Sequence, residues 1–159
     1  FADSSLGEEG RPNNALPDPF YWHGNEPALH AAALFVPAGD PNRGTHWARE
    51  IMERLYNDTP DGIPGNDDGG TLSSWYLFTS IGMYPVAGSD LYYLSAPLFE
   101  EVRVDLGDGE SLTLLAPGAS YETREIASVT LNGEELDSFE IRHGQLAGAT
   151  IEFELVAAQ

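Results

Sequence analysis

Residues 61–78 read Asp-Gly-Ile-Pro-Gly-Asn-Asp-Asp-Gly-Gly-Thr-Leu-Ser-Ser-Trp-Tyr-Leu-Phe, an acidic, glycine-rich loop followed by an apolar segment with helical spacing. The glycines allow tight turns, and Pro64 restricts the residue before it to extended conformations. We expect Asp67 and Asp68 at the N-terminus of the helix, where the helix dipole favours an ionised carboxylate. Such a loop can form a catalytic or metal-binding site, but Asp and Asn also cap helices without further function.

Two more helices are expected before this loop, after an irregular stretch over residues 1–22. The segment 26–36 is almost continuously apolar, follows a candidate N-cap at Asn25, and therefore predicts a helix buried on most sides. The segment 40–56 has an apolar face at four-residue spacing, made of Trp47, Ile51 and Leu55. Its charged residues are expected to face solvent: Arg49, Glu50, Glu53 and Arg54. The third helix is predicted over 71–83.

After residue 88 the hydrophobic period changes to that of strands, separated by turns that contain glycine. Six strands are predicted, over 91–94, 99–106, 111–116, 127–131, 138–142 and 150–155. Helices followed by strands indicate an α+β fold, with a boundary near 86–90. We therefore predict a helical segment over 1–88 and an antiparallel, sandwich-like β part over 89–159.

The composition narrows the partners of the chain. Its 159 residues carry a formal charge of −19 and no lysine, which disfavours nucleic acid and leaves neutral sugars and cations as better candidates. The absence of cysteine removes disulfides and thiolate metal sites. No apolar run approaches the ~20 residues that span a bilayer. The sequence from Phe1 lacks the basic and apolar regions of a signal peptide, so we expect a mature chain or a piece of one.

A second candidate site lies at residues 21–27, Tyr-Trp-His-Gly-Asn-Glu-Pro. Asn25 and Glu26 offer the oxygen ligands that calcium prefers. Trp22 and His23 place rings beside these polar groups, an arrangement typical of a sugar subsite. The alternative is structural, with Asn25 as a helix cap and the rings in the core.

Several motifs, in order along the chain, resemble the C-terminal part of glycoside hydrolase family 92, the calcium-dependent exo-α-mannosidases. They cover roughly residues 20–155 and include His23-Gly-Asn-Glu-Pro27, Arg49-Glu-Ile-Met52, Pro60-Asp-Gly-Ile-Pro-Gly-Asn-Asp-Asp68, Ser74-Trp-Tyr76, Gly82-Met-Tyr-Pro85, Ser95-Ala-Pro-Leu-Phe99 and Val129-Thr-Leu-Asn-Gly133. The resemblance implies an inverting hydrolase with a catalytic α/α toroid, of which this chain would supply some of the helices. It also implies Ca²⁺ as cofactor.

The resemblance assigns roles residue by residue. Asp68 would be the general base, Asn66 would stand where many relatives have a second water-orienting Asp, and Asp67 would support them. Asn25 and Glu26 are the calcium candidates. The candidates for sugar contact are Trp22, His23 and Trp75. The family's general acid lies in an upstream motif that resembles Glu-Gly-Asn-x-Trp-Gln-Tyr, and nothing in this sequence matches it.

We therefore expect the C-terminal portion of a secreted or extracytoplasmic α-mannosidase that acts on mannose-containing glycans. The remaining segment of the same enzyme would supply the catalytic acid and an N-terminal β-sandwich. The alternative is a non-catalytic module that binds calcium and carbohydrate, or serves as a structural accessory, through the same loops.

Overall fold

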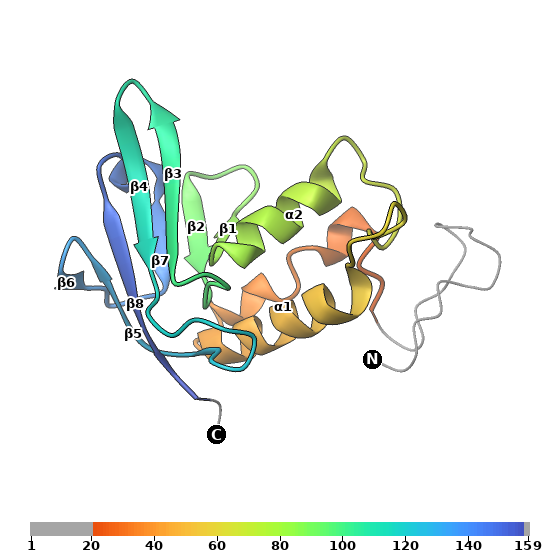
Figure 1. Ribbon diagram of the computed structural model, residues 1–159, viewed down its shortest axis with the longest axis horizontal. Coiled ribbons are helices and arrows are strands. Elements are labelled where there is room, and N and C mark those ends of the chain that lie inside the picture. The colour runs from red at the N-terminus through yellow and green to blue at the C-terminus, as the bar shows by residue number, and fades with distance from the viewer. Residues whose placement is uncertain (1–20, 158–159) are drawn as a thin grey trace.

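The computed structural model describes residues 21–157, so the expected irregular stretch at 1–22 lies almost wholly outside the described residues. Figure 1 shows the two α-helices side by side at one end of the molecule and the strands gathered at the other. Helix α1 spans Pro41–Leu55 and helix α2 spans Thr71–Ser80. The helix predicted over 40–56 is confirmed, with Asp40 as N-cap accepting the Arg43 amide at 3.2 Å.

The helix predicted over 26–36 is wrong in type. Residues Glu26–Ala28 and Ala33–Phe35 form two short 3-10 helices, η1 and η2, joined by turns. Leu29, Ala32 and Val36 are buried, whereas Leu34 is 47% exposed, so one side of the segment packs inward. The backbone lies close to α1, since a Cβ on Gly44 would come within 2.8 Å of the Ala32 carbonyl oxygen. Contact with α1 therefore outweighs the helical preference of the alanines.

The strands form two sheets. The smaller has the order β1-β2-β7 (Met83–Pro85, Leu91–Leu94, Glu140–Arg142) and is antiparallel. The larger has the order β3-β4-β8-β5-β6 (Glu101–Gly107, Glu110–Leu115, Thr150–Val156, Glu125–Leu131, Glu134–Glu135). The six predicted strands are confirmed within about two residues at each end. Strands β1 and β6 and the 3-10 helix η3 (His143–Gln145) were not predicted.

The expectation of purely antiparallel strands is wrong at one place, because β4 and β8 are parallel. Strand β8 lies between two hairpins, β3–β4 and β5–β6, and it is antiparallel to β5. Because β4 and β5 run in opposite directions, a strand between them has to be parallel to one and antiparallel to the other. The α+β class itself is confirmed.

Two hydrophobic clusters organise the chain. One joins inward residues of both sheets, including Leu94 and Ile141 from the smaller and Leu114 and Phe153 from the larger, which makes the β part a sandwich. The other joins α1, α2 and the segment before them, with Ile51, Met52, Leu72 and Trp75 at its centre. Strand β1 belongs to the sheet although it precedes residue 88. The division into 1–88 and 89–159 stays a prediction.

Arg49 corrects the predicted orientation of α1. We expected it in solvent, but it is 1% exposed, between the buried Thr45 and Met52 on the same stripe of the helix. Its Nη2 donates to the carbonyl oxygens of Ala96 at 3.0 Å and Pro97 at 2.6 Å. The core face is thus rotated from the predicted one, and Arg49 fastens α1 to the sandwich.

Candidate functional site

The two candidate loops, which are far apart in the sequence, meet at their backbones. A Cβ on Gly24 would collide with the carbonyl oxygen of Pro64 and come within 2.7 Å of the Trp22 ring. A Cβ on Gly65 would lie 3.4 Å from the Cα of Gly24. Glycine at both positions lets the chains approach this closely. The structure therefore brings the acidic loop and the loop of Asn25 and Glu26 into a single region.

His23 lies beneath this region rather than on its surface. Its side chain is fully buried, its Nδ1 lies 2.7 Å from the Tyr21 hydroxyl oxygen, and its Nε2 lies 2.8 Å from the Tyr56 hydroxyl oxygen. Burial lowers the pKa of the imidazole to about 3, so the ring is neutral at ordinary pH. Both ring nitrogens are therefore engaged by tyrosine hydroxyl groups.

Trp75 has a comparable position on α2. It is 6% exposed, its indole N–H donates to the Leu29 carbonyl oxygen at 2.9 Å, and its ring meets the His23 ring edge-on, with centroids 4.2 Å apart. Trp22 is half-buried, with its ring against Gly24 and Gly65. Of the three rings expected to contact sugar, Trp22 therefore has the most accessible surface.

The two adjacent aspartates have different surroundings. The N-cap of α2 is Gly70, but Asp67 also serves this helix end, because its Oδ1 accepts the amide of Ser73 at 2.9 Å and its carbonyl oxygen accepts the amide of Thr71 at 2.7 Å. Asp67 therefore has a structural role at the helix N-terminus without being the N-cap residue. Asp68 is exposed and has a left-handed backbone, with φ at 48°.

The carboxyl group of Asp68 lies against that of Glu26. Partial desolvation raises the pKa of Asp68, and so do the charge of Glu26, a hydrogen bond between the two carboxyl groups, and the charge of Asp67. This direction is opposite to the one expected from the helix dipole alone. A hydrogen bond between two carboxyl groups needs a shared proton, and two ionised groups in this position would repel each other. The pair is therefore suited to holding a proton or a cation.

The donors for calcium are incomplete within residues 21–157. No cluster of three or more His, Asp or Glu side chains that could hold a metal occurs in this part of the chain. Glu26 and Asp68 form a pair, and Asn25, which is exposed, is the adjacent amide. Calcium takes about 6–8 oxygen ligands. The oxygen atoms of Asn25, Glu26 and Asp68 are of the kind that calcium binds, but they would fill only part of its coordination sphere.

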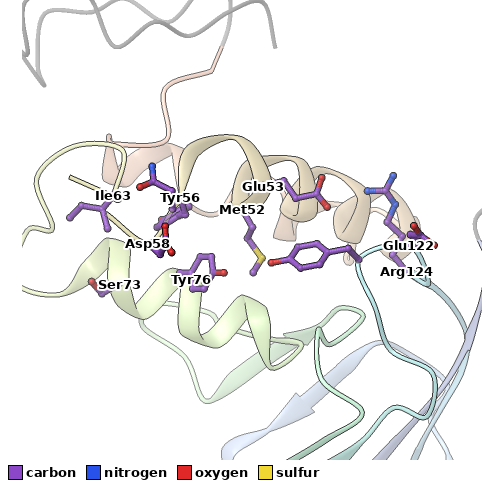
Figure 2. Close-up of a pocket in the computed structure, with 12 residues that line it drawn as sticks. Met52, Glu53, Tyr56, Asp58, Ile63, Ser73, Tyr76, Glu122 and Arg124 are labelled. Atoms are coloured by element: carbon purple, nitrogen blue, oxygen red, sulfur yellow. The ribbon is translucent and has the colours of Figure 1, made fainter. Parts of the chain in front are cut away.

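An open groove of about 950 Å³ lies between α1, α2 and the loop after Pro117. Figure 2 shows Met52 and Tyr76 pointing into the space between the two helices, with Glu122 and Arg124 at one end. Tyr56, Ile63 and Tyr121 also line it. Sequence analysis did not identify the groove, because its walls come from segments that only the fold brings together.

Comparison with known proteins gives the class of the chain. It is 34% identical over 136 residues to an uncharacterized secreted glycosidase of Arthroderma benhamiae, covering 83% of this chain and 18% of that protein. The structure superposes on a family GH92 α-mannosidase of Bacteroides thetaiotaomicron with a TM-score of 0.81 at 34% identity, covering 87% of this chain and 19% of that one. A GH92 inverting mannosidase of the same organism gives 0.79 at 31%, with the same coverage.

These relatives are described as a glycosidase and as mannosidases. The family model described as "Glycosyl hydrolase family 92 catalytic domain" matches residues 2–157, so the chain belongs to glycoside hydrolase family 92. The resemblance seen in the sequence motifs is confirmed. The chain spans about a fifth of the length of the relatives it matches.

Proposed function

We propose that this chain is the base-bearing C-terminal portion of an inverting exo-α-mannosidase that hydrolyses terminal α-mannosides. The main support is the close approach of the backbones at Gly24 and Pro64, which brings the two family motifs together and leaves Glu26 near enough to Asp68 to raise its pKa. Further support comes from family membership and from two structural relatives described as mannosidases, one of them as inverting.

In this proposal the Asp68 carboxylate accepts a proton from water as the water oxygen attacks the anomeric carbon. The glycosidic bond breaks, and the leaving oxygen takes a proton from an acid supplied by another segment. A raised pKa makes Asp68 a stronger base once it is ionised. Asn66, which is exposed beside it, can orient the water through its amide but cannot accept the proton.

We propose that Glu26 is not the acid that pairs with Asp68. Acid and base in inverting glycosidases are ~6.5–9.5 Å apart, so that a water molecule fits between them. The Glu26 carboxyl group is close enough to Asp68 to raise its pKa through its charge and through hydrogen bonding. This geometry supports the proposal that the acid comes from a part of the enzyme outside residues 21–157.

We propose that Asn25 and Glu26 contribute to a calcium site. Bound calcium would supply positive charge that binds sugar hydroxyls and offsets the repulsion between Glu26 and Asp68. Trp22 is the ring we propose for sugar contact. We propose that His23 and Trp75 support the site from below without touching the sugar, because both are buried and hydrogen-bonded to neighbouring segments.

We further propose that the rest of the enzyme packs on α2. Residues 71–80 include no charged side chain, yet Ser73 and Ser74 are exposed and Leu77 is 60% exposed. A helix without charges is normally covered. The groove between α1 and α2 lies on the same side as Ser73 and offers room for another segment.

A secreted or extracytoplasmic location is supported by the secreted relative. No helix within residues 21–157 is both long enough and apolar enough to cross a bilayer.

The alternative, a binding module without catalysis, is favoured by the absence of a matching acid motif in the sequence. The two functions separate in an assay of the complete enzyme on an α-mannobiose, with calcium and then with excess chelator, following the anomer by proton NMR. We expect calcium-dependent release of β-mannose.

Asp68→Asn should abolish turnover and leave the fold intact. The matched control is Asp61→Asn, because Asp61 is an exposed residue of the same loop. Retained turnover in Asp68→Asn would remove Asp68 from the role of base.

A further inference from the structure

The buried network around His23 has no part in the proton transfers proposed above. It joins four segments of the chain. The Tyr21 hydroxyl contacts His23 Nδ1, and His23 Nε2 contacts the Tyr56 hydroxyl at the end of α1. The Tyr56 hydroxyl also reaches the Leu72 carbonyl oxygen in the first turn of α2, at 3.2 Å. The Tyr21 hydroxyl reaches the Ala28 carbonyl oxygen at 3.3 Å.

The protons available to this network limit its arrangement. A neutral imidazole has one N–H, and each tyrosine has one O–H, so three protons serve the four contacts. With the proton on Nε2, His23 donates to Tyr56, Tyr56 donates to the Leu72 carbonyl, and Tyr21 donates to Nδ1. With the proton on Nδ1, the chain runs in the other direction, to the Ala28 carbonyl. Either tautomer leaves one of the two backbone contacts without a proton.

The network is enclosed by rings. The Tyr56 ring stacks on Trp75, with centroids 5.9 Å apart and an interplanar angle of 10°, and Trp75 meets His23 edge-on. Polar groups in such a place are costly to leave unpaired, so the hydrogen bonds have little freedom to change partners. Losing one of the tyrosine hydroxyls would therefore leave a buried ring nitrogen without its partner.

The position of the network connects it to the site. His23 immediately precedes Gly24, whose backbone lies against Pro64, and the Glu26 side chain follows two residues later. On the other side, Leu72 comes directly after the loop that carries Asp68. The hydrogen bond between His23 and Tyr56, together with the contact of Tyr56 with Leu72, thus links the two loops beneath the site.

We propose that His23, held by Tyr21 and Tyr56, is a positioning residue that fixes the loop of Glu26 against the loop of Asp68. The inference rests on the proposed function, because it concerns the same site. The buried hydrogen bond between His23 and Tyr56, rather than the exposed carboxyl groups, then sets how the two loops lie against each other.

The test is Tyr56→Phe in the complete enzyme, with Tyr92→Phe as the matched control. Tyr92 also contacts a histidine, His143, through its hydroxyl, at 3.0 Å, but on the exposed surface of the sandwich. Groups that orient metal ligands typically contribute 10–100-fold to metal affinity or activity. We expect Tyr56→Phe to lower kcat and to weaken calcium binding, measured by calorimetry, each by roughly tenfold or more. Tyr92→Phe should change neither.

Amide hydrogen exchange supplies a readout that does not depend on activity. In Tyr56→Phe, exchange should accelerate within 22–26 and 63–68 while the sandwich strands keep their protection; in Tyr92→Phe these two loops should be unchanged. Tyr21→Phe provides a second variant if Tyr56→Phe does not fold. Exchange in the two loops equal to that of wild type would overturn the inference. Wild-type enzyme that neither releases mannose nor binds calcium would instead refute the proposed function, and the exchange comparison would still decide the role of His23.

Discussion

Replacing Arg49 by methionine should weaken the attachment of α1 to the sandwich. The guanidinium is 1% exposed and its Nη2 donates to the carbonyl oxygens of Ala96 and Pro97. Its centre lies 5.7 Å from the centroid of the Tyr121 ring. Methionine has a similar length and fills much of the same space, so the substitution mainly removes the hydrogen bonds and the charge.

The magnitude follows from the two carbonyl groups left behind. Each buried acceptor without a partner costs about 1–3 kcal/mol, which gives a loss of roughly 2–6 kcal/mol for the pair. Part of this is recovered, because burial disfavours the cation and lowers its pKa to about 10, and because Nη1 has no hydrogen-bond partner within residues 21–157. We therefore expect a net loss of about 2–4 kcal/mol in the free energy of unfolding.

The measurement is urea unfolding followed by tryptophan fluorescence, with Arg54→Met as the control on the same helix. Arg54 is half exposed and pairs with Glu50 at 2.9 Å, so its replacement should cost no more than about 0.5 kcal/mol. A free energy for Arg49→Met within about 1 kcal/mol of wild type would refute the reasoning, because the two carbonyl groups would then not depend on the guanidinium.

Two further predictions concern the core of the site. The folded pKa of His23 is about 3, below its ordinary 6.5, so between these values the unfolded chain binds a proton that the folded chain does not. The free energy of unfolding should therefore fall with pH from 6.5 downward, by about 2 kcal/mol between pH 7 and pH 5, relative to His23→Gln in parallel denaturation experiments. Gly24→Ala should destabilise the chain by about 1–3 kcal/mol, since the new Cβ meets the Pro64 carbonyl and the Trp22 ring; Gly144→Ala, which meets nothing within 4 Å, should have little effect in thermal unfolding, and equal effects would contradict the close approach.

Local sequence patterns were enough to predict the elements whose structure depends on one apolar face. The strands follow from alternation, and α1 follows from its cap and its apolar spacing. The segment 26–36 was misassigned because apolar composition does not distinguish an α-helix from two turns of 3-10 helix packed on a neighbour. Arg49 was misassigned because a charged residue usually indicates solvent, and the carbonyl groups that accept its hydrogen bonds lie far along the chain.

The sequence predicted the two loops of the candidate site separately. It could not predict that the fold brings them together. The contact of Gly24 with Pro64 and that of Glu26 with Asp68 depend on the fold. The resemblance assigned the base to Asp68, but local sequence did not tell which aspartate would bond to the start of α2; in the structure Asp67 accepts the Ser73 amide, after a turn with positive φ at Gly69 and Gly70. For His23 the sequence left open sugar contact or a place in the core, and burial between Tyr21 and the distant Tyr56 agrees with the second.

The place of β8 in the larger sheet sets an order of events during synthesis. The hairpins β3–β4 and β5–β6 are complete before residue 150 is made, but they have no strand between them until β8 arrives. Until then β4 and β5 each carry an open edge, and the sandwich core lacks Ile151 and Phe153. A nascent chain that stalls shortly before residue 150 would therefore expose two unpaired strand edges, each able to pair with a strand of a neighbouring chain on the polysome.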